Sequence, residues 1–123
     1  MLIFRLNAPV YYANALSVRA GVEQMIEAQE APPRTVVLDL SVQDSLDITS
    51  AEMFAKLVAK LQQAGIEVVV AEVHAPVLAF ARKSGLLAHL GPERIFPAVD
   101  AAMDALADPD PPSPQTVTAT GDL

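Results

Sequence analysis

Hydrophobic positions along the chain alternate between short strand-like runs and longer stretches with helical spacing. Residues 2–6 are a β-rich run, residues 35–40 are almost continuously apolar, and residues 66–71 form another apolar run of strand length. A nearly continuous apolar strand is typical of one that helices cover on both faces. We therefore predict a central strand at residues 35–40 and a last, short strand at residues 95–96.

Four stretches between and after these runs carry apolar residues at helical spacing. They are Val18, Val22, Met25 and Ile26; Met53, Phe54, Leu57, Val58 and Leu61; the segment from Pro76 to Ser84; and Val99, Ala102, Met103 and Leu106, in a closing helix expected to begin at Pro97. Asn14 is expected to cap the first helix, and residues 31–33 to stop it. Gly65 and Gly85 stand where the C-terminal caps of the second and third helices belong.

The beginning of the chain predicts a hairpin. Residues 2–6 and 10–12 are β-rich, and Asn7-Ala8-Pro9 between them is typical of a turn. With the later elements the order is ββαβαβα(β)α, in which strands alternate with helices over short connections. The sequence thus predicts an α/β fold, with a mainly parallel sheet of four to five strands, a hairpin-like N-terminus and about four flanking helices.

Composition separates a folded part from a tail. Residues 108–123 hold four of the ten prolines, three acidic residues and no basic residue. So little apolar side chain cannot offset the entropy lost on ordering a segment. We predict one domain at residues 1–107, followed by a disordered, acidic and proline-rich tail at residues 108–123.

Charge and residue content exclude several classes of function. The formal net charge is −7 and there is no cysteine, so nucleic acid is not an expected partner and disulfides and thiolate metal sites are ruled out. Neither a dinucleotide-binding glycine motif nor a phosphate-binding P-loop is present. His74 and His89 have no second ligand at metal-binding spacing and are expected at helix ends or on the surface. We therefore do not predict an enzyme, a metal site or a firmly bound cofactor.

The segment 39–52 is the strongest candidate for a site. It follows the carboxyl end of the predicted central strand, where open α/β sheets commonly place ligands or partners. Its candidate residues are Asp39, Ser45, Asp47, Thr49 and Ser50. A helix N-terminus offers free N–H groups and a partial positive charge, so a phosphate on Thr49 or Ser50 would be stabilised there, although Asp47 would oppose it.

The same residues also have a structural interpretation. Residues 49–52, Thr-Ser-Ala-Glu, fit a capping box, with Thr49 as the cap, and Asp47 is an alternative cap. Asp39 and Asp44 have no paired base and are expected to be solvated loop or turn residues.

Several blocks along residues 2–107 resemble a STAS domain, the fold shared by anti-sigma factor antagonists and the cytoplasmic C-terminal region of SulP-type sulfate and anion transporters. Residues 2–15, an apolar strand followed by Arg, Ala-Pro, an aromatic pair and Ala-Asn-Ala, are similar to the transporter version. Residues 36–41 with Asp47-Ile48-Thr49-Ser50 resemble the family's strand and its Asp-x-Ser/Thr loop. Residues 84–86 and 90–96 resemble its closing helix and strand.

The transporter resemblance implies a regulatory domain on the cytoplasmic side of the cell membrane, excised here from an integral membrane protein. The implied partners are the transmembrane domain of its own transporter, acyl carrier protein or a regulatory kinase, and a homodimer formed through the full-length transporter. The resemblance also implies nucleotide binding. Few basic residues and no aromatic residue stand near the loop, so we expect GTP or GDP to bind only weakly there.

The alternative is a free-standing phospho-switch protein like the anti-sigma factor antagonists, with Thr49 as the acceptor of phosphate. In those proteins a loop serine is phosphorylated by a partner kinase, which switches partner binding. This chain departs from that pattern because Thr49 stands at the acceptor position, Ile48 replaces a serine and Ser50 replaces a glycine. The residues at the start of the chain favour the transporter branch.

Overall fold

The computed structural model describes residues 1–6, 10–11, 13–43, 45–85, 88, 90–106 and 115–117. Strands and helices alternate along most of this length. In chain order they are β1 (Leu2–Leu6), α1 (Ala15–Glu27), β2 (Thr35–Asp39), α2 (Ile48–Gln63), β3 (Glu67–Ala71), α3 (Ala75–Ser84), a 3-10 turn η1 (Pro92–Arg94), β4 (Ile95–Phe96), α5 (Val99–Leu106) and β5 (Gln115–Val117).

The strands form one sheet in the order β4-β3-β2-β1-β5, and every ladder in it is parallel. In the centre, Ile3 pairs with Val37 and Val37 with Val69. The predicted α/β class and mainly parallel sheet of four to five strands are confirmed, as are four α-helices in the described ranges. None of these helices has the length and apolar character needed to cross a bilayer.

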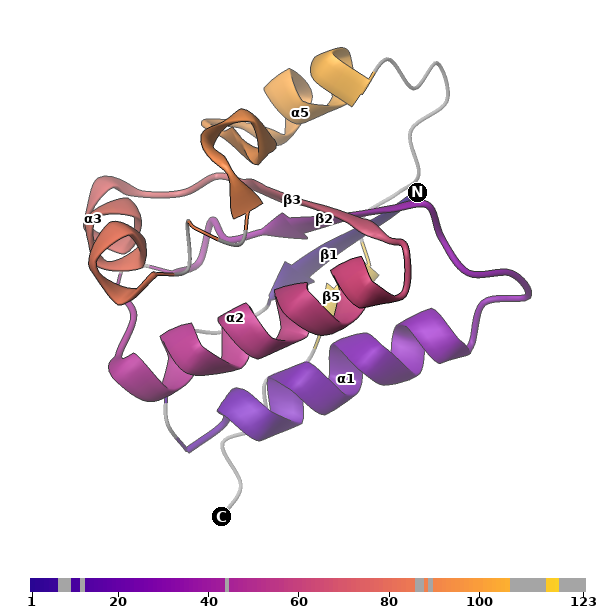
Figure 1. Cartoon of the computed structure of the whole chain (residues 1–123), viewed down its shortest axis with the longest axis horizontal. Helices are drawn as coiled ribbons and strands as arrows, with labels where there is room; N and C mark the ends of the chain where they lie inside the picture. The colour runs from indigo at the N-terminus through magenta and orange to yellow at the C-terminus, as the bar shows by residue number, and fades with distance from the viewer. Residues whose placement is uncertain are drawn as a thin grey trace.

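Two hydrophobic cores lie on opposite faces of the sheet. Side chains alternate along β2, so Val36 and Leu38 join one core and Val37 joins the other. The larger core is closed by α1, α2 and α3, and the smaller one by α5 with Val99 and Ala102. Figure 1 shows α1 and α2 side by side on one side of the sheet and α5 on the opposite side. The prediction that helices cover the central strand on both faces is confirmed.

Helix ends follow the local sequence closely. Gly85 ends α3 with φ at +83°, the left-handed conformation that glycine adopts without strain. Gly65 takes the same conformation just after α2. Pro76 stands in the first turn of α3, as expected. By contrast, α1 ends at Glu27, several residues before the prolines that were expected to stop it.

The predicted N-terminal hairpin is not formed in the described residues. Both sides of β1 are taken by parallel neighbours, β2 and β5, so no antiparallel partner has room. Val10 is instead buried, and its N–H donates to Oε1 of Gln43 at 2.7 Å. The carbonyl of Tyr11 accepts from the N–H groups of Asn14 and Ala15, which turns the chain into α1. The predicted turn at residues 7–9, and Tyr12, lie outside the described residues.

The C-terminal segment also differs from its prediction. Gln115–Val117 is a strand, β5, that pairs with β1 at the sheet edge, so the expected disorder of residues 108–123 is wrong for these three residues. The side chain of Val117 is 1% exposed and belongs to the larger core. Burial of Val117 and pairing with the otherwise open edge of β1 stabilise a strand here, although residues 115–117 have little strand character of their own. The rest of the predicted tail, and its boundary at residue 107, lie outside the described residues.

Candidate functional site

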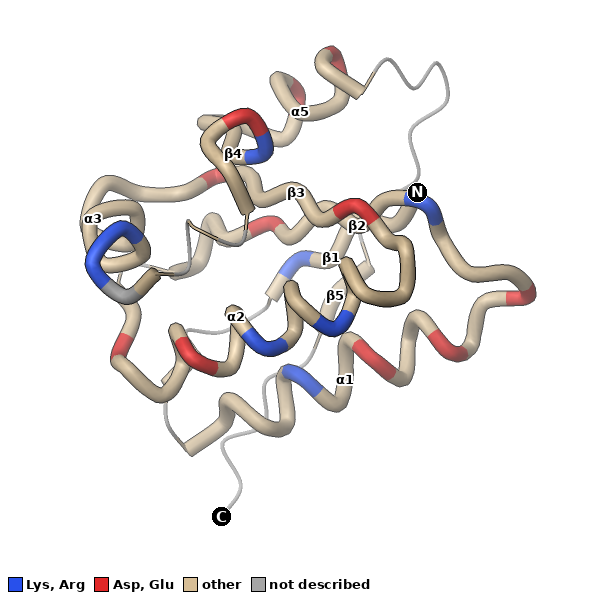
Figure 2. The backbone as a smooth tube through the Cα atoms, viewed as in Figure 1, with Lys and Arg blue, Asp and Glu red and all other residues tan. Residues whose placement is uncertain are grey.

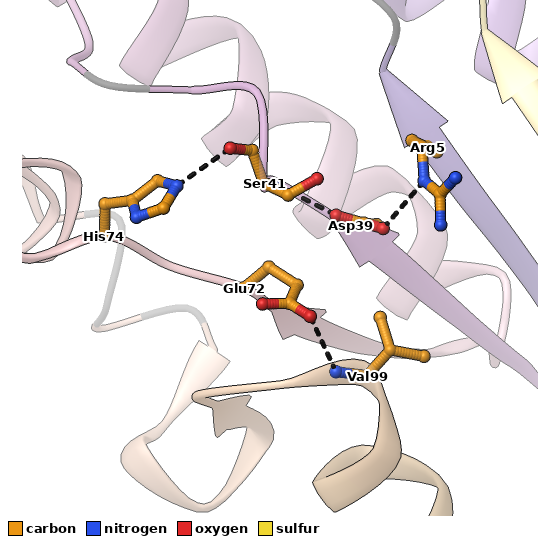
Figure 3. A network of polar contacts seen from close by, with 6 residues as sticks. All are labelled: Arg5, Asp39, Ser41, Glu72, His74 and Val99. Carbon is orange, nitrogen blue, oxygen red and sulfur yellow. Dashed lines mark hydrogen bonds and ion pairs between the residues drawn. The ribbon is translucent and has the colours of Figure 1, made fainter.

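Polar residues gather where the parallel strands end. Asp39 is the last residue of β2, and the register sets it beside Arg5 of β1 and Ala71 of β3. Figure 3 shows Arg5, Asp39 and Ser41 in one chain of contacts, with His74 reaching Ser41 from the start of α3. The loops after β2 and β3 are therefore tied together at this edge.

Asp39 is a buried carboxylate held by two neighbours. Its side chain is 3% exposed. Its Oδ2 lies 3.1 Å from Nε of Arg5, and its Oδ1 accepts from the backbone N–H of Ser41 at 2.9 Å. Burial raises the pKa of Asp39, but the hydrogen bonds from Ser41 and the charge of Arg5 outweigh it, so the pKa lies below the ordinary value. The expectation of a solvated loop residue is thus wrong for Asp39, which is a buried structural anion.

His74 and Glu72 connect the loop after β3 to the loop after β2 and to the start of α5. Nε2 of His74 lies 2.8 Å from the carbonyl oxygen of Ser41. Glu72 adopts a left-handed φ of 60°, and its Oε1 accepts from the N–H of Val99 at the start of α5, at 3.4 Å. His74 stands directly before α3, which confirms the helix-end position expected for it. His89 lies outside the described residues.

The remaining candidates lie at the start of α2. Asp47 is the N-cap, and its Oδ1 accepts from the N–H of Ser50 at 2.7 Å. The alternative cap is therefore the observed one, and the capping box on Thr49 is not formed because Thr49 already lies inside the helix. Thr49 and Ser45 are exposed, whereas Ser50 is fully buried. Among the described residues, Oγ of Ser50 has no hydrogen-bond partner.

The five predicted site residues therefore divide into two groups. Asp39 belongs to the network at the strand ends. Asp47, Thr49 and Ser50 share the first turn of α2, and Ser45 lies in the loop before it. Asp44, the other acid weighed in this segment, lies outside the described residues.

Exposed apolar side chains lie at the starts of α1 and α2. In the described part of the chain, the large apolar residues that are exposed are Tyr11 (41%), Leu16 (75%) and Ile48 (68%). All three lie at the start of α1 or α2. Leu16 and Thr49 line one groove, between α1 and α2, and Ile48 and Phe80 line a second groove, between α2 and α3. We call Leu16, Ile48 and Thr49, with these two grooves, the helix-start surface.

Basic residues border the helix-start surface. Arg19 and Lys56 line the first groove, Lys83 lines the second, and Glu52 lines both. Figure 2 shows basic residues on α1, α2 and α3, the helices that form these grooves. Arg19 is paired with Glu23, so Lys56 and Lys83 against Glu52 leave this surface with a small positive balance in a chain whose net charge is −7. It suits a partner segment with apolar and acidic side chains.

A second ion-pair cluster stands further along the same two helices. Oε1 of Glu23 lies 3.0 Å from Nε of Arg19 and 3.3 Å from Nζ of Lys60. Burial raises the pKa of Glu23, but hydrogen bonds from Arg19 and Lys60 outweigh it, so the pKa is lower than usual. This cluster fastens α1 to α2 and so fixes the spacing of the first groove.

The structure adds residues that the sequence interpretation missed. Gln43 is fully buried and accepts the N–H of Val10, and no sequence signal marked it for this role. Arg5 could have been noticed as a cation inside an apolar run that pairs with the central strand. Leu16 could have been found because it falls outside the apolar stripe of its helix. No group of three or more His, Cys, Asp or Glu residues in the described ranges could hold a metal ion.

Comparison with known sequences identifies a family and its transporter relatives. Residues 1–102 match the STAS domain family. Sulfate transporter 3.2 of Arabidopsis thaliana is 29% identical over 129 residues, which cover 94% of this chain and 20% of that protein. Solute carrier family 26 member 10 of Mus musculus is 30% identical over 125 residues, which cover 96% of this chain and 18% of that protein. The chain thus spans about a fifth of the length of these curated relatives.

Solved structures share the same fold. The SulP transporter STAS domain from Vibrio cholerae matches with a TM-score of 0.72 and 19% identity, covering 86% of this chain and 80% of that one. The murine Solute Carrier 26 family member A9 anion transporter matches with a TM-score of 0.73 and 22% identity, covering 86% of this chain and 18% of that one. The resemblance that residues 2–107 suggested is confirmed. The chain belongs to the STAS domain family.

Proposed function

We propose that this chain is the regulatory STAS domain of a SulP-like anion transporter, and that it acts through protein contacts at the helix-start surface without catalysing a reaction. The observation that carries this proposal is the exposure of Leu16 and Ile48 on either side of Thr49. Leaving large apolar side chains in water at the rim of two grooves is typical of a surface that another protein covers. The curated relatives, which are transporters about five times as long, support the membrane portion of the same protein as that partner.

The first test is the native reading frame. A SulP-like transporter needs roughly ten or more apolar segments of about 20 residues each upstream of this region. A frame that encodes them together with this domain supports the proposal. A native frame that begins at Met1 without such segments contradicts it.

The second test measures transport by the full-length protein. Leu16→Asp with Ile48→Asp places two charges on the helix-start surface, and Ala31→Asp with Ala105→Asp places the same two charges at exposed positions elsewhere. We expect the first pair to change the rate of radiolabelled sulfate uptake at least several-fold at equal amounts of protein in the membrane. The control pair should leave the rate unchanged. Equal uptake by both pairs would show that the helix-start surface has no regulatory role.

The exposure of Thr49 favours one alternative, a phospho-switch in which a kinase modifies this residue. Ser50 does not compete as an acceptor because it is fully buried. Incubation with the cognate kinase should then add the mass of one phosphate to the wild-type chain and none to Thr49→Ala, as measured by intact mass spectrometry. No mass gain in the wild type excludes this alternative. Weak GTP or GDP binding at the same loop stays a prediction, which titration calorimetry at millimolar nucleotide tests.

A further inference from the structure

The C-terminal strand β5 is a short strand at the edge of the sheet. Within the described residues it pairs with β1 at Phe4, Arg5 and Leu6, opposite Gln115, Thr116 and Val117. The residues that join it to α5 span positions 107–114 and include four prolines. β5 is thus a short element that eight residues join to the rest of the fold.

The position that receives β5 is shaped for it. Gly21 lies in the middle of α1, where glycine weakens a helix relative to alanine. A Cβ at this position would lie 3.2 Å from Cγ1 of Val117, closer than ordinary van der Waals contact. The missing side chain at Gly21 therefore leaves a notch that Val117 fills, and Val117 is 1% exposed as a result.

An empty β1 edge would be costly. The N–H and C=O groups on this side of β1 would lose their partners, and the notch would open onto the larger core, in which Phe4 and Leu6 are fully buried. The edge site, made of Phe4, Arg5, Leu6 and Gly21, thus needs an extended segment with a β-branched residue opposite Gly21. Thr116 points away from this notch and is exposed.

We propose that this edge site also accepts β5 from a second copy of the chain, so that two molecules exchange their C-terminal segments. A second copy carries the same residues 115–117, and the structure shows that these residues fit the edge site when they come from the same chain. Starting from α5, which contacts β3 and β4, a segment must pass about three strand spacings, roughly 14 Å, to reach the β5 position. Eight residues span up to roughly 26 Å, about 12 Å more than this path, so the linker allows β5 to reach the edge site of a second molecule that lies within that margin.

Two full-length variants separate the donor of the strand from its acceptor. Gly21→Leu fills the notch, blocks the acceptor and strengthens helix propensity, while its own residues 115–117 remain intact. Val117→Asp destroys the donor and leaves the acceptor empty. Each variant alone can form no exchanged pair. A mixture of the two has one working donor and one working acceptor.

The test mixes these variants and measures mass by size-exclusion chromatography with light scattering. We expect a 1:1 heterodimer from Gly21→Leu with Val117→Asp and monomers from each alone, with circular dichroism showing both folded. Thr116→Asp is the matched control: it adds the same charge on the exposed side of β5, keeps its own strand in place and should form no heterodimer with Gly21→Leu. Folded variants that stay monomeric when mixed at millimolar concentration would overturn the proposal.

A second measurement does not depend on either of these variants. The chain has no cysteine. A Cβ at position 21 would lie 3.2 Å from Cγ1 of Val117, which is close enough for a disulfide between cysteines at these two positions. Mass-tagged Gly21→Cys mixed with Val117→Cys should give a mixed disulfide-linked dimer on oxidation, at a level that rises with protein concentration. Absence of this mixed product, while a chain carrying both cysteines closes its internal disulfide, also overturns the proposal.

Discussion

At the scale of single residues, Asp39 and Ser50 show opposite ways of burying a polar group. Asp39 is ionised and held by Arg5 and Ser41, whereas Oγ of Ser50 is buried with no partner among the described residues. A buried carboxylate needs its donors, because their loss leaves an uncompensated charge. A buried hydroxyl without a partner only costs stability. Removing a donor to Asp39 is therefore expected to lower the free energy of unfolding, and removing the hydroxyl of Ser50 is expected to raise it.

Arg5→Met is expected to raise the pKa of Asp39 and to lower the free energy of unfolding by about 1 kcal/mol at neutral pH, a modest loss because the Arg5 side chain is half exposed. The pKa of Asp39 is depressed in the folded state, so its contribution is present above the unfolded value, taken as 3.8, and is lost as the pH falls through the folded pKa. Urea denaturation at several pH values should show the wild-type advantage shrinking below pH 3.8.

The control for this prediction is Arg34→Met, which removes an exposed arginine just before β2. It should leave the pKa of Asp39 unchanged and alter the free energy of unfolding by less than about 0.5 kcal/mol. An Arg5→Met protein with the same stability as Arg34→Met at neutral pH would mean that Arg5 does not hold Asp39.

Ser50→Ala is expected to raise the free energy of unfolding by about 1 kcal/mol. It removes a buried hydroxyl that has no partner among the described residues and introduces a better helix former. Chemical denaturation followed by circular dichroism measures this change. A loss of stability instead of a gain would show that Oγ of Ser50 makes a hydrogen bond that the fold needs.

At the scale of elements, the start of α2 shows how neighbouring residues choose between two possible caps. Asp47 and Thr49 are both good N-cap residues, so the local sequence left the choice open. Leu46 before Asp47 and Ala51 within the first turns are both buried, which places the helix start at Ile48. This packing belongs to the folded core and could not be read from residues 46–52 alone. The cap was therefore predictable only as a pair of alternatives.

Asp47→Ala is expected to lower the free energy of unfolding by about 1 kcal/mol, because the N–H of Ser50 loses its acceptor and the helix N-terminus loses a favourable negative charge. Thr49→Ala is the matched control and should change the value by less than about 0.5 kcal/mol, since Thr49 is exposed inside the helix. Urea denaturation of both variants gives the comparison. A larger loss for Thr49→Ala than for Asp47→Ala would indicate that Thr49 caps the helix instead of Asp47.

Strands were predictable to the extent that their signal is local. The continuous apolar run of β2 indicated a strand with helices on both faces, and alternating burial of Val36, Val37 and Leu38 in the two cores confirms it. Residues 115–117 carry no such signal, because three residues behind a proline-rich segment do not form a strand by themselves. Their structure comes from the edge of β1 and from the notch at Gly21. A glycine in mid-helix was the one available sign of that close approach.

At the scale of the whole molecule, the two faces of the sheet carry different features. The α5 face carries the buried Arg5–Asp39 pair at the strand ends, while the α1–α2–α3 side carries the exposed apolar helix-start surface. The segment 39–52, which includes Thr49, could be located from the sequence, but the apolar neighbours contributed by α1 and α3 could not, because helix packing alone brings those elements together. The α/β class and the family resemblance could be predicted from residues 2–107. The shape of the surface could not.

The most direct test of the proposed regulatory contact is photocrosslinking in the full-length protein embedded in its membrane. Benzoylphenylalanine replaces Leu16, at the helix-start surface, or Asp104, an exposed residue of α5. Proteolysis and mass spectrometry then locate the adducts. We expect position 16 to form adducts with the membrane portion of the same protein and position 104 to form none. No adduct from position 16 above the level found at position 104 would contradict the proposed contact.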